Sequence, residues 1–167
     1  MTEREPRILV VFFSRTGVTK NLAEAIARAE HGDLEELREA RSRRGFFGWL
    51  RSGYDGTYRR AAETLPLQHD LTRYDLVFVG SPTWNESLSS PVRGFLRLHA
   101  SELKEAAIFA TCGGHGADEV LEQMARLLRR APLARLPLQE RDARLNPAVW
   151  AAEFAETAIG AWKARHT

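Results

Sequence analysis

The stretch Ile8-Leu9-Val10-Val11-Phe12-Phe13-Ser14-Arg15-Thr16-Gly17-Val18-Thr19 decides the fold of this chain. Six consecutive apolar residues predict a strand that is buried on both faces. The strand ends at a turn rich in hydroxyls and glycine, and a helical pattern follows over residues 17–29. Such a turn leaves backbone N–H groups unpaired at a helix N-terminus, which suits the binding of a phosphate.

Three features of residues 14–19 favour a phosphate. Ser14, Thr16 and Thr19 carry hydroxyl donors, Gly17 permits close backbone approach, and the helix directs its positive end at the turn. Neither a Walker motif nor a Gly-x-Gly-x-x-Gly fingerprint is present, which argues against a P-loop nucleotidase and an ordinary Rossmann dehydrogenase. The alternative is that Ser14 or Thr16 merely caps the helix. Residues 14–19 alone support phosphate binding and helix capping equally.

Length and composition indicate an ordinary globular protein. The 167 residues suffice for one sizeable core, so we expect a single domain over 1–167. The apolar runs have strand length and the N-terminus is charged, so we expect no membrane span and no signal peptide. One cysteine, Cys112, excludes an internal disulfide framework and a cysteine metal cage, and it is compatible with a cytoplasmic location.

Strand-like and helix-like patterns alternate along the chain. The predicted helices cover residues 17–29, a segment after Pro91, the stretch around 120–128, and 146–164 near the C-terminus. This alternation predicts a parallel sheet with right-handed crossovers and helices on both faces. In such a sheet ligands bind beyond the carboxyl ends of the strands, which directs attention to loops 14–19, 81–91 and 112–117. The predicted strands are 8–13, 33–37, 76–80, 106–111 and 133–138.

The order of these segments resembles the flavodoxin-like superfamily, and in particular a short-chain flavodoxin family protein. The similarity rests on residues 8–29, on Tyr74-Asp75-Leu76-Val77-Phe78-Val79-Gly80-Ser81-Pro82-Thr83-Trp84, on residues 91–96, and on Ala110-Thr111-Cys112-Gly113-Gly114-His115-Gly116. It implies a three-layer α/β/α sandwich whose five-stranded parallel sheet has the order 2-1-3-4-5. It also implies FMN as cofactor, in electron transfer or in reduction of a small acceptor such as a quinone.

The resemblance implies a binding role for three loops and no catalytic or metal-ligating residue. The phosphate would lie on the first loop and the isoalloxazine ring between the other two. The expected cofactor-binding residues are Ser14, Arg15, Thr16, Gly17, Val18, Thr19, Pro82, Thr83, Trp84, Asn85, Cys112, Gly113, Gly114, His115 and Gly116.

Several of these residues have a second interpretation. Trp84 offers a flat face to a flavin, and the flanking motif favours that contact over a core tryptophan. Cys112 is better explained as a packed residue than as a nucleophile. His115 could donate to the flavin or cap the following helix, and Asn85 and Glu86 stand where the family often has small or aromatic residues.

A basic aromatic segment at about 38–66 interrupts the pattern. Between residues 38 and 60 the sequence has seven arginines and only two acids, Glu39 and Asp55, although the whole chain has a net charge of only +2. One interpretation is that the aromatics at 46–54 pack in the core. The other is that the segment binds a partner by electrostatic attraction, such as a protein redox partner, whereas binding of nucleic acid is disfavoured. If exposed, this stretch would favour a homodimer. The basic charge makes docking on a basic ferredoxin-like partner doubtful.

Three classes of function follow. They are an electron carrier, an NAD(P)H-dependent FMN oxidoreductase of the quinone reductase type, and a binding or regulatory module that keeps the fold without flavin chemistry. The sequence does not distinguish the carrier from the reductase.

Overall fold

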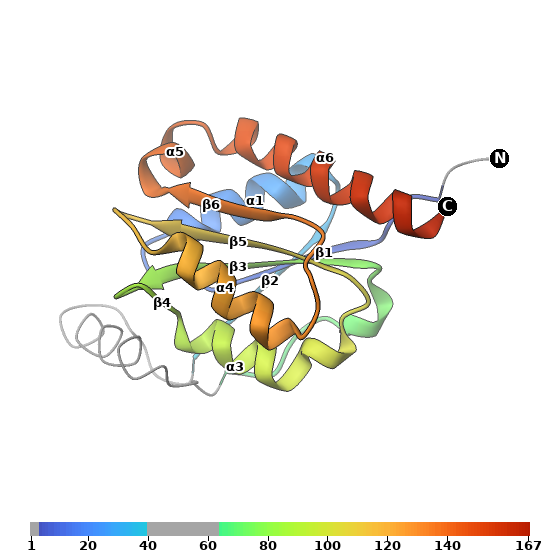
Figure 1. Cartoon of the computed structure of the whole chain (residues 1–167), viewed down its shortest axis with the longest axis horizontal. Coiled ribbons are helices and arrows are strands. Elements are labelled where there is room, and N and C mark those ends of the chain that lie inside the picture. Colours follow the sequence, from blue (N-terminus) through green and yellow to red (C-terminus); the bar gives the residue numbers. More distant parts are fainter. Residues whose placement is uncertain (1–3, 40–63) are drawn as a thin grey trace.

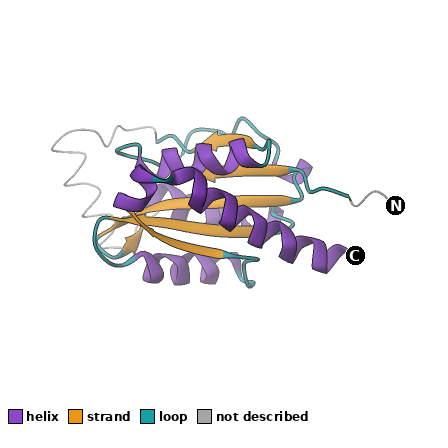
Figure 2. Cartoon of the chain, turned by 90° about the horizontal axis from the view of Figure 1, so that it is seen from above, coloured by secondary structure: helices purple, strands orange, loops and turns teal. Residues whose placement is uncertain are grey.

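A parallel sheet lies between two layers of helices in the computed structural model (Figures 1 and 2). The structure describes residues 4–39 and 64–167. The parallel strands have the order β2-β1-β3-β5-β6, and a short β4 pairs antiparallel with β3. The predicted order of the five parallel strands is therefore confirmed, with β4 as an addition. The strands are β1 (Ile8–Phe12), β2 (Asp33–Glu36), β3 (Leu76–Trp84), β4 (Ser87–Leu88), β5 (Ala106–Cys112) and β6 (Arg135–Gln139).

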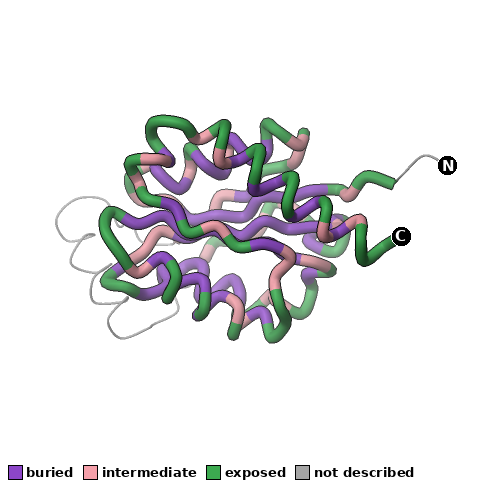
Figure 3. The backbone as a smooth tube through the Cα atoms, turned by 45° about the horizontal axis from the view of Figure 1, so that its top comes forward, coloured by how far each residue is buried: buried purple, intermediate pink, exposed green. Residues whose placement is uncertain are grey.

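The helices divide between the two faces of the sheet. One face packs against α3 and α4, and the other against α1, α5 and α6, so that each face has its own apolar cluster. Figure 3 shows the buried central strands between the more exposed helices. The helices are α1 (Val18–Ala29), α3 (Ser90–His99), α4 (Ala117–Leu128), α5 (Glu140–Leu145) and α6 (Pro147–His166), with 3-10 turns η1 (Leu71–Arg73) and η2 (Ala100–Glu102).

The three central strands are apolar because both of their faces are covered. Successive residues of β1, such as Leu9 and Val10, are fully buried in opposite clusters. Gly80 lets β3 pass the ring of Phe109, since a Cβ atom there would lie 2.1 Å from that ring. The edge strands are more exposed, and β6 carries Pro137, which is tolerated at a sheet edge.

The third strand is longer than the sequence predicts. Residues 81–84, which we expect to lie in a loop, continue β3: Ser81 and Pro82 still pair with β5, and Thr83 and Trp84 pair with β4. The reversal occurs at Asn85 and Glu86, which both have positive φ angles of 49° and 57°. Two such residues between paired strands form a tight hairpin turn. The sequence predicts that this strand ends at Gly80, because the continuous apolar run ends there.

Two other boundaries differ from the predicted ones. The last strand covers Arg135–Gln139 rather than 133–138, and the C-terminal helix is preceded by the separate helix α5. An edge strand lacks the uninterrupted apolar run of a central strand, so its limits are poorly marked in the sequence.

Most of the basic aromatic segment lies outside the described residues, but its two ends are described. Glu39 and Thr64 form an antiparallel bridge, and the Leu65 N–H donates to the Arg38 carbonyl at 2.7 Å. The chain therefore leaves and re-enters the described structure at one place, just after β2. No helix within 4–39 and 64–167 is long and apolar enough to cross a membrane.

Candidate functional site

The first loop places the N-terminus of α1 at the carboxyl end of β1. Gly17 precedes the helix with a φ of 93°, a conformation that glycine adopts without strain. The Gly17 N–H donates to the Ser14 hydroxyl at 3.1 Å. No side chain caps the first turn of α1, and no acidic residue lies in it. Within the described residues, the Ser14 hydroxyl thus bonds to the residue that precedes the helix and not to an N–H of its first turn, and Thr16 makes no such bond.

The six residues of this loop differ in accessibility. Thr16 is exposed, and Ser14, Arg15 and Gly17 are half-buried, whereas Val18 and Thr19 are buried. Thr16 is therefore the residue of this loop that is most accessible to a ligand. Such an uncapped helix start attracts an anion through its N–H groups and its dipole.

Thr19 joins the first loop to the end of β5. Its hydroxyl oxygen lies 2.8 Å from that of Thr111, and both side chains are buried. The Thr19 hydroxyl is therefore engaged within the protein, which leaves Thr16 as the exposed hydroxyl of the turn. This contact fixes the helix start against the strand that leads into the third loop.

The second loop is the β3–β4 hairpin. Pro82 and Thr83 are half-buried and Asn85 is exposed, while Trp84 is only 5% exposed. The Trp84 ring packs edge-on against Phe13, with centroids 5.5 Å apart. This is the arrangement of a core tryptophan, the second of its two expected interpretations.

Thr83 carries an unsatisfied polar atom. Its hydroxyl oxygen is buried and has no hydrogen-bond partner in the described part of the chain. Buried hydroxyls are rarely left unpaired, so such an atom at a strand end is a candidate contact for a bound molecule.

The third loop follows β5 and is lined by glycines. Gly113, Gly114 and His115 are exposed, and a Cβ atom at Gly114 would meet nothing within 4 Å. The Gly114 carbonyl accepts from the Gln139 side chain at 2.7 Å. The loop therefore leaves open space beside its backbone, where polar main-chain groups can reach a ligand edge.

Cys112 is buried at the start of this loop. Burial raises the pKa of its thiol, while backbone hydrogen bonds from Ala117 and Gly114 act in the opposite direction. A thiol with a raised pKa is a poor nucleophile at neutral pH, which agrees with a packing role.

The second and third loops touch each other. His115 Nδ1 lies 3.1 Å from Glu86 Oε1, and a Cβ atom on Gly116 would lie 2.9 Å from the Glu86 Cα. Helix α4 begins after Gly116 without a side-chain cap, so the structure does not show His115 as a cap.

A buried polar network holds the hairpin in place. The Gln123 side-chain oxygen accepts hydrogen bonds from the Arg93 guanidinium at 2.9 Å, the Ser87 hydroxyl at 3.1 Å and the Leu88 N–H at 3.2 Å. The Gln123 amide also donates to the Glu86 carbonyl at 3.4 Å. The supporting role of Gln123 was not predicted from the sequence, which shows only a polar amide beside the apolar face of a predicted helix.

Taken together, these contacts bring the three loops to one edge of the sheet. A doubly wound parallel sheet with the order β2-β1-β3-β5-β6 and ligand-type loops at the carboxyl ends of its central strands has the flavodoxin-like fold. The chain belongs to the flavodoxin family, because the family model described as "Flavodoxin" matches residues 7–136.

Solved structures show the same fold at low sequence identity. A flavoprotein in complex with FMN from Lactobacillus acidophilus is 19% identical, with a TM-score of 0.67, and the match covers 86% of this chain and 99% of that one. The two-electron reduced flavodoxin of Megasphaera elsdenii is 18% identical with a TM-score of 0.57, covering 92% and 98%. A WrbA-like flavodoxin from Agrobacterium tumefaciens is 18% identical with a TM-score of 0.59, covering 92% and 97%. Among curated proteins, none matches this chain.

Proposed function

We propose that this chain binds FMN at the three loops and uses it to transfer electrons or to reduce a small acceptor such as a quinone. Membership of the flavodoxin family supports FMN as the cofactor. The observation that carries the proposal is the uncapped start of α1, fixed by the Thr19–Thr111 contact beside a glycine-lined loop.

The residues present fit such a ligand. The first turn of α1 offers N–H groups without a competing side chain or acid, and the Thr83 hydroxyl is buried without a partner in the described chain. The space beside Gly114 is open. An anionic group and a polar ring edge would satisfy these features together.

The roles of the residues follow from their positions. The backbone of residues 14–19 and the Thr16 hydroxyl would hold the phosphate, with the Arg15 charge nearby. Pro82, Thr83 and Asn85 would lie on one side of the ring, supported from the core by the buried Trp84, and residues 112–116 on the other. Thr19 and Gln123 would act as positioning residues, because both are engaged within the protein.

When bound, FMN would supply the electron-accepting and electron-donating chemistry itself. The chain contributes binding, orientation and partial exclusion of water. We assign no catalytic acid or base.

A paired substitution tests where the phosphate binds. Replacing Thr16 with Val should weaken FMN binding by about tenfold or more, since a hydrogen bond to a charged group is worth roughly 1.5–3 kcal/mol. Thr157→Val, at an exposed threonine of α6, is the matched control and should leave the affinity unchanged. Riboflavin, which lacks the phosphate, should bind both variants equally. Equal loss of riboflavin and FMN binding in Thr16→Val would contradict a phosphate contact.

A second experiment separates the reductase from the carrier. Rapid bleaching of the bound-flavin absorbance by NADH or NADPH would support the reductase. Reduction only through a protein donor would support the carrier. The cytoplasmic location, a partner docked on residues 38–60 and a homodimer remain predictions, and most of that segment lies outside the described residues.

A further inference from the structure

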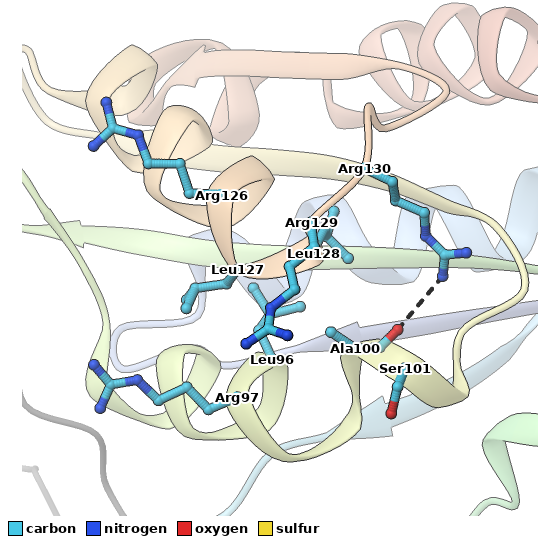
Figure 4. A pocket seen from close by; sticks show the side chains of 9 residues that line it. All are labelled: Leu96, Arg97, Ala100, Ser101, Arg126, Leu127, Leu128, Arg129 and Arg130. Carbon is cyan, nitrogen blue, oxygen red and sulfur yellow. Dashed lines mark hydrogen bonds between the residues drawn. The ribbon is translucent and has the colours of Figure 1, made fainter.

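A basic hollow lies between the last turns of α3 and α4. Its volume is about 540 Å³, and Leu96, Leu127 and Leu128 contribute apolar side chains to it (Figure 4). This volume is within the range of small-molecule sites.

Four arginines surround this hollow. Arg97 comes from α3, Arg126 from the last turn of α4, and Arg129 and Arg130 from the residues that follow α4. Figure 4 shows Arg129 over the middle of the hollow, with Arg97 and Arg126 toward one end and Arg130 at the other. No carboxylate is among the described residues that line it.

The arginines differ in how they are held. Arg130 donates to the carbonyls of Lys104 at 2.8 Å and Ala100 at 3.5 Å, and also to that of Leu103, so its guanidinium is fixed in place. Arg97, Arg126 and Arg129 make no side-chain hydrogen bond or ion pair with the described residues. Their donors are thus available to a ligand.

The nearest acids lie outside the lining of the hollow. Glu102 contacts His99, Glu122 pairs with Arg135, and Asp118 and Glu119 lie with Glu122 in a neighbouring hollow on the other side of Arg126. The positive charge is therefore concentrated locally in a chain whose net charge is only +2.

Favourable interaction with the helix dipoles explains only part of this arrangement. Cations near a helix C-terminus are stabilising, which accounts for Arg97 and Arg126 in the last turns of α3 and α4. Arg129, however, has a φ of 58° at the end of α4, where glycine is the usual residue. A non-glycine residue in this conformation carries a backbone cost, and here it places a guanidinium over the hollow.

We infer that this hollow binds a soluble organic polyphosphate, with its phosphates on Arg97, Arg126 and Arg129 and its apolar body against the half-buried Leu127. Guanidinium groups match phosphate oxygens in charge and in paired hydrogen-bond geometry. Two or more linked phosphates fit a set of separate arginines better than a single carboxylate does.

This site is distinct from the loop cluster of the proposed function. The loops lie at the start of α4, after Gly116, whereas the hollow lies at the opposite end of that helix. A 12-residue helix is about 18 Å long. Binding at the hollow can therefore be measured in the absence of FMN.

Calorimetric titration of the purified chain with ADP, pyrophosphate and adenosine tests the inference. ADP should bind saturably, pyrophosphate more weakly and adenosine not detectably. Arg97→Gln and Arg129→Gly should each weaken ADP binding about tenfold, as expected for loss of a charged hydrogen bond. Arg28→Gln is the matched control, because Arg28 is an exposed arginine in the last turn of α1.

Arg129→Gly gives a second readout. It should weaken ADP binding while leaving the melting temperature unchanged or raised, since glycine adopts the positive φ without strain. Absence of saturable ADP binding at millimolar concentration, or equal affinity in all variants, would overturn the inference. Binding of phosphatidylserine vesicles without binding of ADP would also overturn it. If the protein failed to bind FMN, the ADP titration could still be interpreted, because it requires no flavin.

Discussion

Thr19 and Thr111 are 92 residues apart in the sequence, and their buried hydroxyl oxygens lie 2.8 Å apart in the fold. The contact connects the first turn of α1 with the last residues of β5. It therefore holds two of the three candidate FMN loops in a fixed relation.

Removing this contact should destabilise the protein modestly. Thr19→Val keeps the shape of the side chain but leaves the Thr111 hydroxyl buried without its partner, at a cost of about 1–3 kcal/mol. Thr19→Ser should retain most of the stability. In the double variant Thr19→Val with Thr111→Val, part of the loss should be recovered, because no hydroxyl is then left unpaired. Urea unfolding measures these three variants and the single variant Thr111→Val, and a loss in the double variant equal to the sum of the two single losses would show that the two hydroxyls are not coupled.

Gln123 should matter more to stability than its residue type suggests. Gln123→Leu removes the acceptor for Arg93, Ser87 and Leu88 and should cost about 2–4 kcal/mol, since buried donors lose their partner. Gln139→Leu is the matched control, because Gln139 makes one exposed hydrogen bond to Gly114. Its expected effect on the urea midpoint is small. Equal effects of the two substitutions would show that the network under the hairpin contributes little.

Two glycines with similar backbone angles should respond differently to alanine. Gly17 and Gly116 have φ values of 93° and 98°, so both substitutions introduce backbone strain of about 1 kcal/mol or more. A Cβ atom at Gly17 meets nothing within 4 Å, whereas at Gly116 it lies 2.9 Å from the Glu86 Cα. Gly116→Ala should therefore lower the melting temperature more than Gly17→Ala. The reverse order would mean that Glu86 and Gly116 are not in close contact.

Tyr74 should give a pH-dependent signal. Burial, followed by the hydrogen bond to Asp33 and the charge of that carboxylate, raises its pKa to about 12. The Tyr74 hydroxyl donates to Asp33 Oδ2 at 2.7 Å, which requires the protonated form. Because an unfolded tyrosine has a pKa of about 10, this contribution to stability is complete below pH 10 and is lost between pH 10 and 12.

Absorbance at 295 nm measures this titration directly. The chain has three tyrosines, and Tyr74→Phe should remove the step near pH 12. A Tyr74→Phe protein that keeps that step would assign it to another tyrosine.

The sequence predicted the central sheet well because its signals are local. Uninterrupted apolar runs mark strands covered on both faces, as in 8–12 and 106–112, and the intervening helices show a regular apolar period. The strand order came from the resemblance to flavodoxins, and it is confirmed.

Features set by distant contacts could not be predicted. The continuation of β3 to Trp84 depends on pairing with β4, and on a turn in which Glu86, a residue without a strong turn preference, has a positive φ. The burial of Trp84 depends on Phe13, which lies 71 residues earlier in the chain. Likewise, nothing local in the sequence indicates that Thr19 would bond to Thr111 or that Gln123 would support the hairpin.

The central claim is that the three loops form an FMN site. Its most direct test is a titration of flavin-free protein with FMN, followed by flavin fluorescence and by the absorbance spectrum. The account predicts saturation at one FMN per chain at micromolar concentration, with a shifted flavin spectrum. A colourless protein that does not bind added FMN at these concentrations would contradict it.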